Sequence, residues 1–162
     1  MKTLLIIRHA KAETVLSLPD FERPLNDQGN NDATEMAMRL LQKNIKIDAF
    51  ISSPAKRAKK TAQLFAEVYG NREEEIIEIS DLYQAPSEIF YDLVKEIDER
   101  FHHIAVFGHN PGITHFANSL SSFRVNNMPT CAVFAVQCNI SCWADFTRSK
   151  NEFLLYEYPK KD

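Results

Sequence analysis

The stretch Leu4-Leu5-Ile6-Ile7-Arg8-His9 decides the fold of this 162-residue chain. Four consecutive apolar residues predict a strand buried on both faces, which is typical of a parallel sheet. The run ends in Arg-His, and ligands of open α/β sheets bind beyond the carboxyl ends of the strands. Arg8 can hold an anion through two hydrogen bonds, and His9 can act as nucleophile, acid or base near neutral pH. We therefore expect a phosphate site with a nucleophile at the end of this strand.

Strands and helices alternate along most of the chain. We expect strands at residues 3–7, 49–51, 76–79, 104–107, 132–137 and 153–157, and helices at about 27–44, 54–69, 86–100 and 113–120, the first capped by Asn26. The alternation predicts an α/β fold, a three-layer α/β/α sandwich around a mostly parallel sheet. Because no helix separates the last two strands, we expect an antiparallel hairpin at one sheet edge. Residues 1–162 are interpreted as one domain, with a loose tail at 159–162.

The composition is that of an ordinary globular protein, with 44% hydrophobic and 25% charged residues and a net charge of −3. A mildly acidic chain is a poor candidate for nucleic-acid binding, so we expect no nucleic-acid partner. Three cysteines without a Cys-x-x-Cys pair favour a reducing, cytoplasmic location. The apolar runs are too short for a signal peptide or a membrane helix, so no membrane association is expected. We expect a monomer.

Four residues are the candidate catalytic set: Arg8, His9, Arg57 and His109. Arg57 lies in the helix that follows the second predicted strand, and His109 follows the fourth. If these strands are neighbours, two arginines and two histidines meet above one sheet edge and form a site for a tetrahedral dianion. Arg23, in the loop before the first helix, is a candidate substrate-binding residue. No Cys-His cluster competes for the role, so we expect neither a metal nor another cofactor.

The lysines beside Arg57 have a simpler interpretation. Lys56, Lys59 and Lys60 lie within five positions of one predicted helix. A run of charges of this kind is usually a solvated helix face.

Three motifs, in order, resemble those of the histidine phosphatase superfamily. Arg8-His9-Ala10 resembles its Arg-His-Gly signature, with Ala in place of Gly. Ser53-Pro54-x-x-Arg57-Ala58-x-x-Thr61 resembles its second motif, and Gly108-His109 its third. The resemblance implies a phosphoglycerate mutase-like fold and a metal-independent phosphatase with His9 as the nucleophile and Arg8, Arg57 and His109 around the phosphoryl group.

Further stretches resemble the SixA-type branch of phosphohistidine phosphatases within that superfamily. They are Arg23-Pro24-Leu25-Asn26-x-x-Gly29, Asp81-Leu82-Tyr83-x-Ala85, Gly108-His109-Asn110-Pro111-Gly112, and residues 128–133 with Trp143. The resemblance covers nearly the whole chain and implies a phosphohistidine-bearing protein, of a phosphorelay or phosphotransferase system, as the substrate.

One departure from the superfamily bears on the substrate. Mutase-like members carry a Glu after the third strand as general acid, whereas this chain has Leu82-Tyr83-Gln84-Ala85. An alcohol needs a proton to leave, but the imidazole of phosphohistidine can already carry one near neutral pH. The missing carboxylate therefore favours a phosphoramidate substrate. Other acidic residues remain possible donors: Glu13, Asp20, Glu22 and Glu88.

Two alternatives stay open. One is a phosphatase of small phosphomonoesters, such as sugar or nucleotide phosphates, which the missing Glu disfavours. The other is a non-enzymatic phosphate-binding module, which the presence of all four candidate catalytic residues disfavours.

Overall fold

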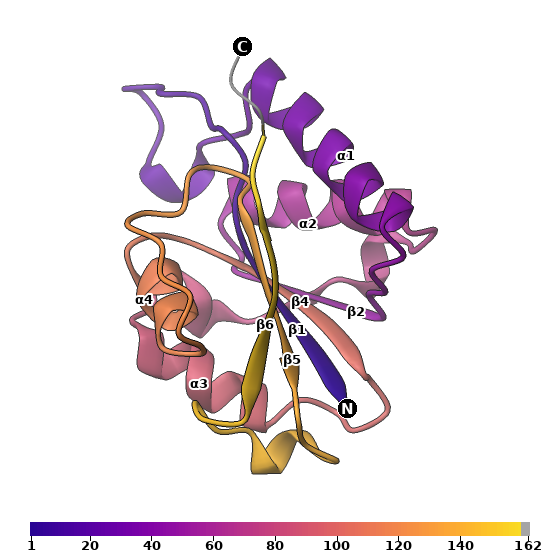
Figure 1. Cartoon of the computed structure of the whole chain (residues 1–162). Helices are drawn as coiled ribbons and strands as arrows, with labels where there is room; N and C mark the ends of the chain where they lie inside the picture. The colour runs from indigo at the N-terminus through magenta and orange to yellow at the C-terminus, as the bar shows by residue number, and fades with distance from the viewer. Residues whose placement is uncertain (160–162) are drawn as a thin grey trace.

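The structure is a computed structural model that describes residues 1–159. The predicted tail lies, apart from Pro159, outside the described residues. Strands β1 (Lys2–Arg8), β2 (Ala49–Ser52), β3 (Ile77–Glu78), β4 (His103–Gly108), β5 (Val133–Cys138) and β6 (Asn151–Glu157) form one six-stranded sheet in the order β3-β2-β4-β1-β5-β6. The helices are α1 (Asp27–Gln42), α2 (Lys56–Val68), α3 (Ser87–Lys95) and α4 (Gly112–Asn118). Figure 1 shows the sheet in the middle of the molecule, with helices on either side.

The strand directions confirm the predicted fold class. Strands β3, β2, β4 and β1 are parallel, β5 is antiparallel to β1, and β6 forms an antiparallel hairpin with β5. Several predicted elements are shorter in the structure, and α1 and α4 each end two residues before their predicted ends. The third strand keeps only Ile77 and Glu78, α2 begins at Lys56 instead of residue 54, and α3 ends at Lys95 instead of residue 100.

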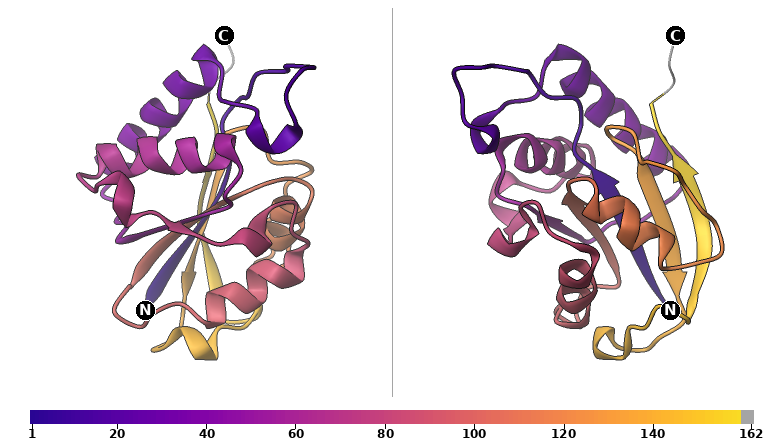
Figure 2. Two further views of the ribbon diagram at one scale, coloured as in Figure 1. Left: turned by 180° about the vertical axis from the view of Figure 1, so that it is seen from behind. Right: turned by 90° about the vertical axis from the view of Figure 1, so that its left-hand side faces the viewer.

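The buried strands have two hydrophobic faces because successive side chains point to opposite sides of a sheet. In β1, Leu5 and Ile7 pack with α1 and α2, while Leu4 and Ile6 pack with α3 and α4. This is why the sequence shows a continuous apolar run in place of an alternating one. The two views of Figure 2 show α1 and α2 on one face of the sheet and α3 and α4 on the other.

The two central strands bring the functional residues together. Arg8 at the end of β1 is in register with Gly108 at the end of β4, and the backbone N–H of His9 donates to the carbonyl of Gly108 at 3.1 Å. His9 and His109 therefore leave adjacent strands at the same edge. Gly112 is required here, because a Cβ at this position would collide with the backbone carbonyl of Ala85.

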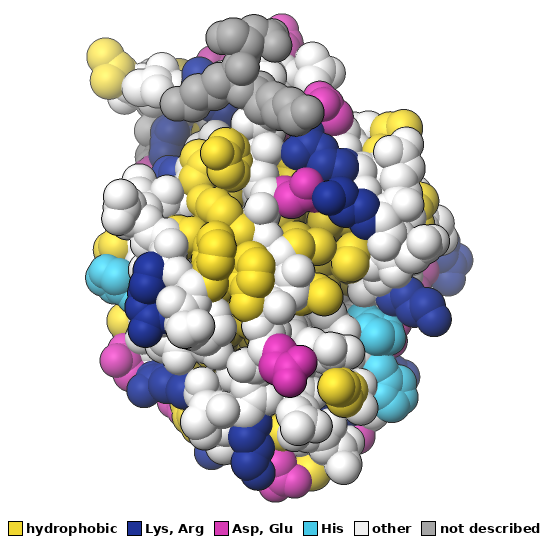
Figure 3. Space-filling model, in the orientation of Figure 1, with side chains coloured by type: hydrophobic (Ala, Val, Ile, Leu, Met, Phe, Trp, Pro, Cys, Tyr) yellow, Lys and Arg dark blue, Asp and Glu magenta, His cyan; other side chains and the backbone are white. Residues whose placement is uncertain are grey.

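The edge strand β6 is less covered than the rest of the sheet. Phe153 and Leu154 are partly exposed, and the ring of Phe123 stacks on that of Phe153 with centroids 4.1 Å apart. Figure 3 shows apolar side chains gathered on this face of the molecule. The face lies over β6 and not over the end of the sheet where His9 and His109 meet.

Candidate active site

A pocket of about 310 Å³ lies above the carboxyl ends of β1 and β4. Its lining includes every candidate site residue predicted from the sequence: Arg8, His9, Arg23, Arg57 and His109. Further lining residues are Lys11, Ala12, Asp20, Gln84, Asn110 and Thr130. The structure thus brings together predicted site residues that are up to 101 positions apart in the chain, from Arg8 to His109.

His9 is held with its ring nitrogen Nε2 unprotonated. Its Nδ1 lies 2.7 Å from the carbonyl oxygen of Ala10, and such an oxygen can only accept, so Nδ1 carries the proton. Nε2 then has a lone pair, toward which Arg57 Nε–H donates at 3.3 Å. Burial lowers the pKa of His9 to about 3, and the neighbouring His109, Arg57 and Arg8 add to this effect. The ring is therefore neutral at pH 7, as a nucleophile must be.

Backbone and side-chain bonds fix the position of His9. The carbonyl of His9 accepts from the N–H of Cys131 at 3.0 Å. Thr61 in α2 accepts from the N–H of Ala10 at 3.0 Å and donates its own hydroxyl to the carbonyl of Arg57 at 2.7 Å. Thr61 is fully buried and links the end of β1 to the helix turn that carries Arg57.

His109 is oriented by Ser53 at the end of β2. Ser53 Oγ lies 2.8 Å from His109 Nε2 and also accepts from the N–H of Ala55 at 3.2 Å. When the Ser53 hydroxyl donates its proton to Nε2, the ring proton of His109 lies on Nδ1. This Nδ1 is buried and has no partner among the described residues. Burial lowers the pKa of His109 to about 4, so a neutral ring can donate Nδ1–H to an oxyanion.

Arg8 and Arg57 supply the positive charge. Arg8 donates through Nη1 to the carbonyl of Met128 at 3.0 Å, while its buried Nε has no partner among residues 1–159. The same carbonyl accepts from Asn110 Nδ2 at 2.9 Å, so the loop before β5 holds both side chains. Because both imidazoles are neutral and a guanidinium stays protonated, the pocket is cationic and suits a dianion.

Asp20 is the acidic residue of this pocket. Its Oδ2 accepts from Arg57 Nη2 at 3.0 Å and from the hydroxyl of Tyr83 at 2.6 Å, and its Oδ1 accepts from Arg23 Nε at 3.1 Å. The backbone carbonyl of Asp20 accepts from Arg57 Nη1 at 2.7 Å. These hydrogen bonds hold the pKa of Asp20 far below its usual range, and the bond from Tyr83 has the largest effect. Asp20 is thus an anion at neutral pH and cannot donate a proton.

Tyr83 and Gln84 occupy the region where mutase-like relatives carry their Glu. The ring of Tyr83 meets that of His109 edge to face, with centroids 5.5 Å apart. Gln84 lines the pocket with its exposed side chain and has a positive φ of 53°. Of the four acidic candidates from the sequence, Asp20 alone lines the pocket among the described residues.

The sequence missed the supporting roles of Ser53, Thr61, Asp20 and Tyr83. Ser53 and Thr61 belong to the same motif as Arg57, and their place in that motif was the sequence feature that could have indicated their roles. Arg23 lines the pocket, and its guanidinium is bound to Asp20 and to the carbonyl of Glu13 at 3.0 Å.

Within residues 1–159, no three His, Cys, Asp or Glu side chains come together in a way that could hold a metal ion. No helix of the described part is both long and apolar enough to cross a bilayer.

Solved structures with the same architecture span nearly the whole chain. A candidate phosphohistidine phosphatase SixA from Agrobacterium tumefaciens is 21% identical, with a TM-score of 0.81 over 98% of this chain and 99% of that one. The protein histidine phosphatase SixA in complex with tungstate is 18% identical, with a TM-score of 0.81 over 96% of each chain. A mycobacterial glucosyl-3-phosphoglycerate phosphatase is 12% identical, with a TM-score of 0.65 over 98% of each chain. At these identities the likeness establishes the fold.

Sequence comparisons give the family. No curated protein matches the chain significantly. The model of the histidine phosphatase superfamily (branch 1) matches residues 4–84, which is half of the chain and includes Arg8, His9 and Arg57. The chain therefore belongs to the histidine phosphatase superfamily and is an enzyme of the phosphatase class.

Proposed function

We propose that the protein hydrolyses phosphohistidine through a phosphorylated His9 intermediate. The observation that carries this proposal is the combination of a neutral nucleophile with a pocket whose lining, within residues 1–159, has no protonated carboxyl group. His9 presents an unprotonated Nε2, while the pocket carboxylate of Asp20 is bound to Arg57, Arg23 and Tyr83 and stays ionised. A leaving group must then depart without help from a side-chain acid, which an imidazole does more readily than an alkoxide.

In the first step, the lone pair of His9 Nε2 exchanges its hydrogen bond from Arg57 Nε–H for a bond to phosphorus, and the bond from phosphorus to the substrate imidazole breaks. The departing imidazole keeps the bond's electron pair and leaves neutral because its other nitrogen carries a proton. Arg8, Arg57 and the Nδ1–H of His109 hold the three equatorial oxygens. Arg23 keeps its bonds to Asp20 and to the Glu13 carbonyl and adds a contact to the phosphoryl group through one of its remaining N–H groups. In the second step, the oxygen of a water attacks phosphorus, and the bond from phosphorus to Nε2 breaks with its electron pair returning to Nε2. Phosphate leaves with the water oxygen, the protons of the water pass to phosphate and solvent, and His9 is neutral again.

A protein substrate fits the surroundings of the pocket. The loop between Ala12 and Arg23, which carries Asp20, extends from the body of the molecule (Figure 1). Its apolar side chains face solvent: Leu16 is 99% exposed, Leu18 40% and Phe21 36%. Exposed apolar groups beside a polar pocket are typical of a protein-binding surface. SixA forms a complex with tungstate, an oxyanion, which supports an oxyanion as the ligand of this chain.

A cytoplasmic location is also proposed for the protein. The three cysteines form no disulfide, which is compatible with a reducing cytoplasm. We propose a monomeric, single-domain enzyme that acts on a phosphorylated protein and binds neither nucleic acid nor membranes.

Initial rates on three substrates test the proposal. We expect kcat/KM for a histidine-phosphorylated protein or peptide to exceed that for p-nitrophenyl phosphate and for a sugar phosphate. Rapid mixing with 32P-labelled substrate should trap a phosphoprotein that is labile in acid and stable in base. A higher kcat/KM on the sugar phosphate would favour a phosphomonoesterase, and no turnover of any substrate would favour a binding module.

A further inference from the structure

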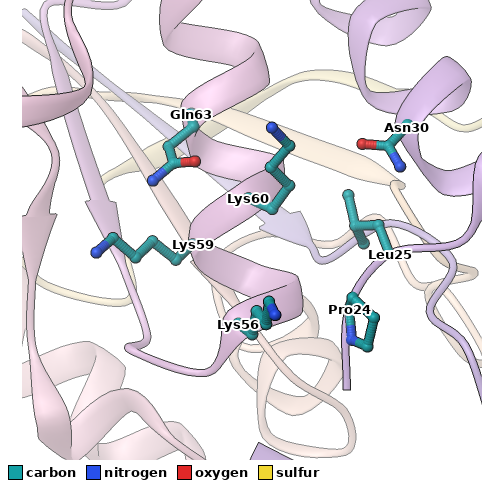
Figure 4. A pocket seen from close by; sticks show the side chains of 7 residues that line it. All are labelled: Pro24, Leu25, Asn30, Lys56, Lys59, Lys60 and Gln63. Atoms are coloured by element: carbon teal, nitrogen blue, oxygen red, sulfur yellow. The ribbon is translucent and has the colours of Figure 1, made fainter. Parts of the chain in front are cut away.

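A second cleft, of about 360 Å³, lies beside the phosphate pocket. Figure 4 shows it between the first turns of α2 and the segment that leads into α1. Its lining residues are Pro24, Leu25, Asn30, Lys56, Lys59, Lys60 and Gln63. Lys56 directly precedes Arg57 and Pro24 directly follows Arg23, so the cleft adjoins the pocket along two segments of the chain.

The lysines of this cleft differ in their charge partners. Lys59 forms an ion pair with Glu78 of β3 at 3.3 Å and points away from Pro24 and Leu25 in Figure 4. Lys56 and Lys60 are exposed, and within residues 1–159 neither takes part in an ion pair. They stand at i and i+4 of one helix, where two like charges repel each other.

The opposite wall of the cleft, formed by Pro24 and Leu25, is apolar and is held in place by the core and by the start of α1. Leu25 is buried against the core, and α1 begins just beyond it with Asn26 as its N-cap, which accepts from the N–H of Gly29 at 2.8 Å. A Cβ on Gly29 would collide with the carbonyl oxygen of Lys11, so the close approach of this segment to the end of β1 depends on glycine. The wall therefore gives the two lysines a fixed apolar counterpart.

We propose that this cleft binds carboxylate side chains that flank the phosphohistidine of the substrate protein, an inference that rests on the proposed function. Lys60 lies about 5 Å along the helix axis from Arg57. A protein that places its phosphohistidine in the pocket thus lays neighbouring residues over this face of α2. Glutamates and aspartates of that partner neutralise Lys56 and Lys60, while their methylenes rest on Pro24 and Leu25.

Two matched phosphohistidine peptides test this, one flanked by glutamates and one by glutamines, with free phosphohistidine as a substrate that cannot reach the cleft. We expect the wild-type enzyme to prefer the glutamate peptide through a lower KM, and Lys60→Glu to lower its kcat/KM roughly tenfold. Turnover of free phosphohistidine should stay unchanged. Raising the salt concentration should reduce the preference, because surface charges are screened.

Lys46→Glu is the matched control. Lys46 is exposed and precedes β2, at the end of the sheet opposite the pocket, so it makes the same change of net charge far from the cleft. An unchanged preference in Lys60→Glu, or an equal loss in Lys46→Glu, would overturn the proposal. If the wild-type enzyme hydrolyses none of the three substrates, the proposed function fails by itself. Fluorescence anisotropy of the labelled, unphosphorylated glutamate peptide then measures its affinity for the wild-type enzyme, Lys60→Glu and Lys46→Glu. The same comparison of these variants tests whether the cleft binds the glutamates.

Discussion

Arg57 Nε lies 3.3 Å from Nε2 of His9, while the Nη atoms of the same guanidinium bind the carboxylate and the backbone carbonyl of Asp20. One side chain therefore touches both the proposed nucleophile and the loop that borders the pocket. Since guanidinium groups only donate, Arg57 requires an unprotonated Nε2 on His9. The state of the nucleophile is thus set by its neighbours before any substrate arrives.

Replacing His9 by Ala should abolish turnover. The variant loses the atom that attacks phosphorus, and we expect kcat to fall by at least about 10³-fold. Rates on a phosphohistidine peptide measure this, and the quench experiment should find no labelled phosphoprotein. Arg8 and Arg57 remain, so binding of tungstate should persist as evidence of a folded site. Retained turnover would remove His9 as the nucleophile.

Replacing Ser53 by Ala should lower kcat roughly tenfold with little change in KM. The variant removes the partner of His109 Nε2, so the ring proton is no longer confined to Nδ1, where it can bind the phosphoryl oxygen. Ser53→Thr keeps a hydroxyl and should recover part of the rate. The 15N shifts of the imidazole give an independent reading, because the two tautomers differ. An Ala variant with wild-type kcat and the wild-type tautomer would contradict this role.

Asp20→Asn should tighten the binding of tungstate and phosphate. The change removes a negative charge that binds Arg57 and Arg23, and an incoming dianion then meets less repulsion. We expect inhibition constants to fall about tenfold. Tyr83→Phe is the matched control, since it deletes the 2.6 Å hydrogen bond to Asp20 without changing the charge. Weaker inhibition by tungstate in Asp20→Asn would show that the carboxylate supports the anion site.

Site residues at the ends of strands could be predicted from the sequence, whereas contacts between irregular segments could not. Arg8, His9 and His109 could be predicted because they end strands, and parallel strands end at one edge. The bond between Asp20 and Tyr83 joins residues 63 positions apart through two irregular segments, whose course no periodic pattern specifies. The end of α3 was missed for a related reason. The apolar spacing continues to Ile97, but Asp98 accepts from the N–H of Arg100 and stabilises a turn.

The free energy of unfolding should fall as the pH drops from 7 to 5. The pKa values of His9 and His109, about 3 and about 4, lie below the unfolded value of about 6.5. In this window the unfolded chain takes up protons that the folded chain does not, so stability decreases by at most ~1.4 kcal/mol per pH unit for each ring. Urea titrations at several pH values measure the slope. His109→Asn should have a shallower slope, and an identical slope would mean that His109 titrates normally when folded.

Gln84→Glu should raise the turnover of alkyl phosphates. Gln84 lines the pocket in the stretch where mutase-like relatives carry their acid, so a carboxyl group there could protonate an alkoxide as it leaves. We expect kcat on a sugar phosphate to rise about tenfold. Nitrophenolate and imidazole leave without such help, so rates on p-nitrophenyl phosphate and phosphohistidine should change little. Gln84→Ala controls for the loss of the amide. Equal gains on all three substrates would show that position 84 affects access to the pocket. No gain on the sugar phosphate would mean that the absence of this carboxylate does not determine which leaving groups the enzyme accepts.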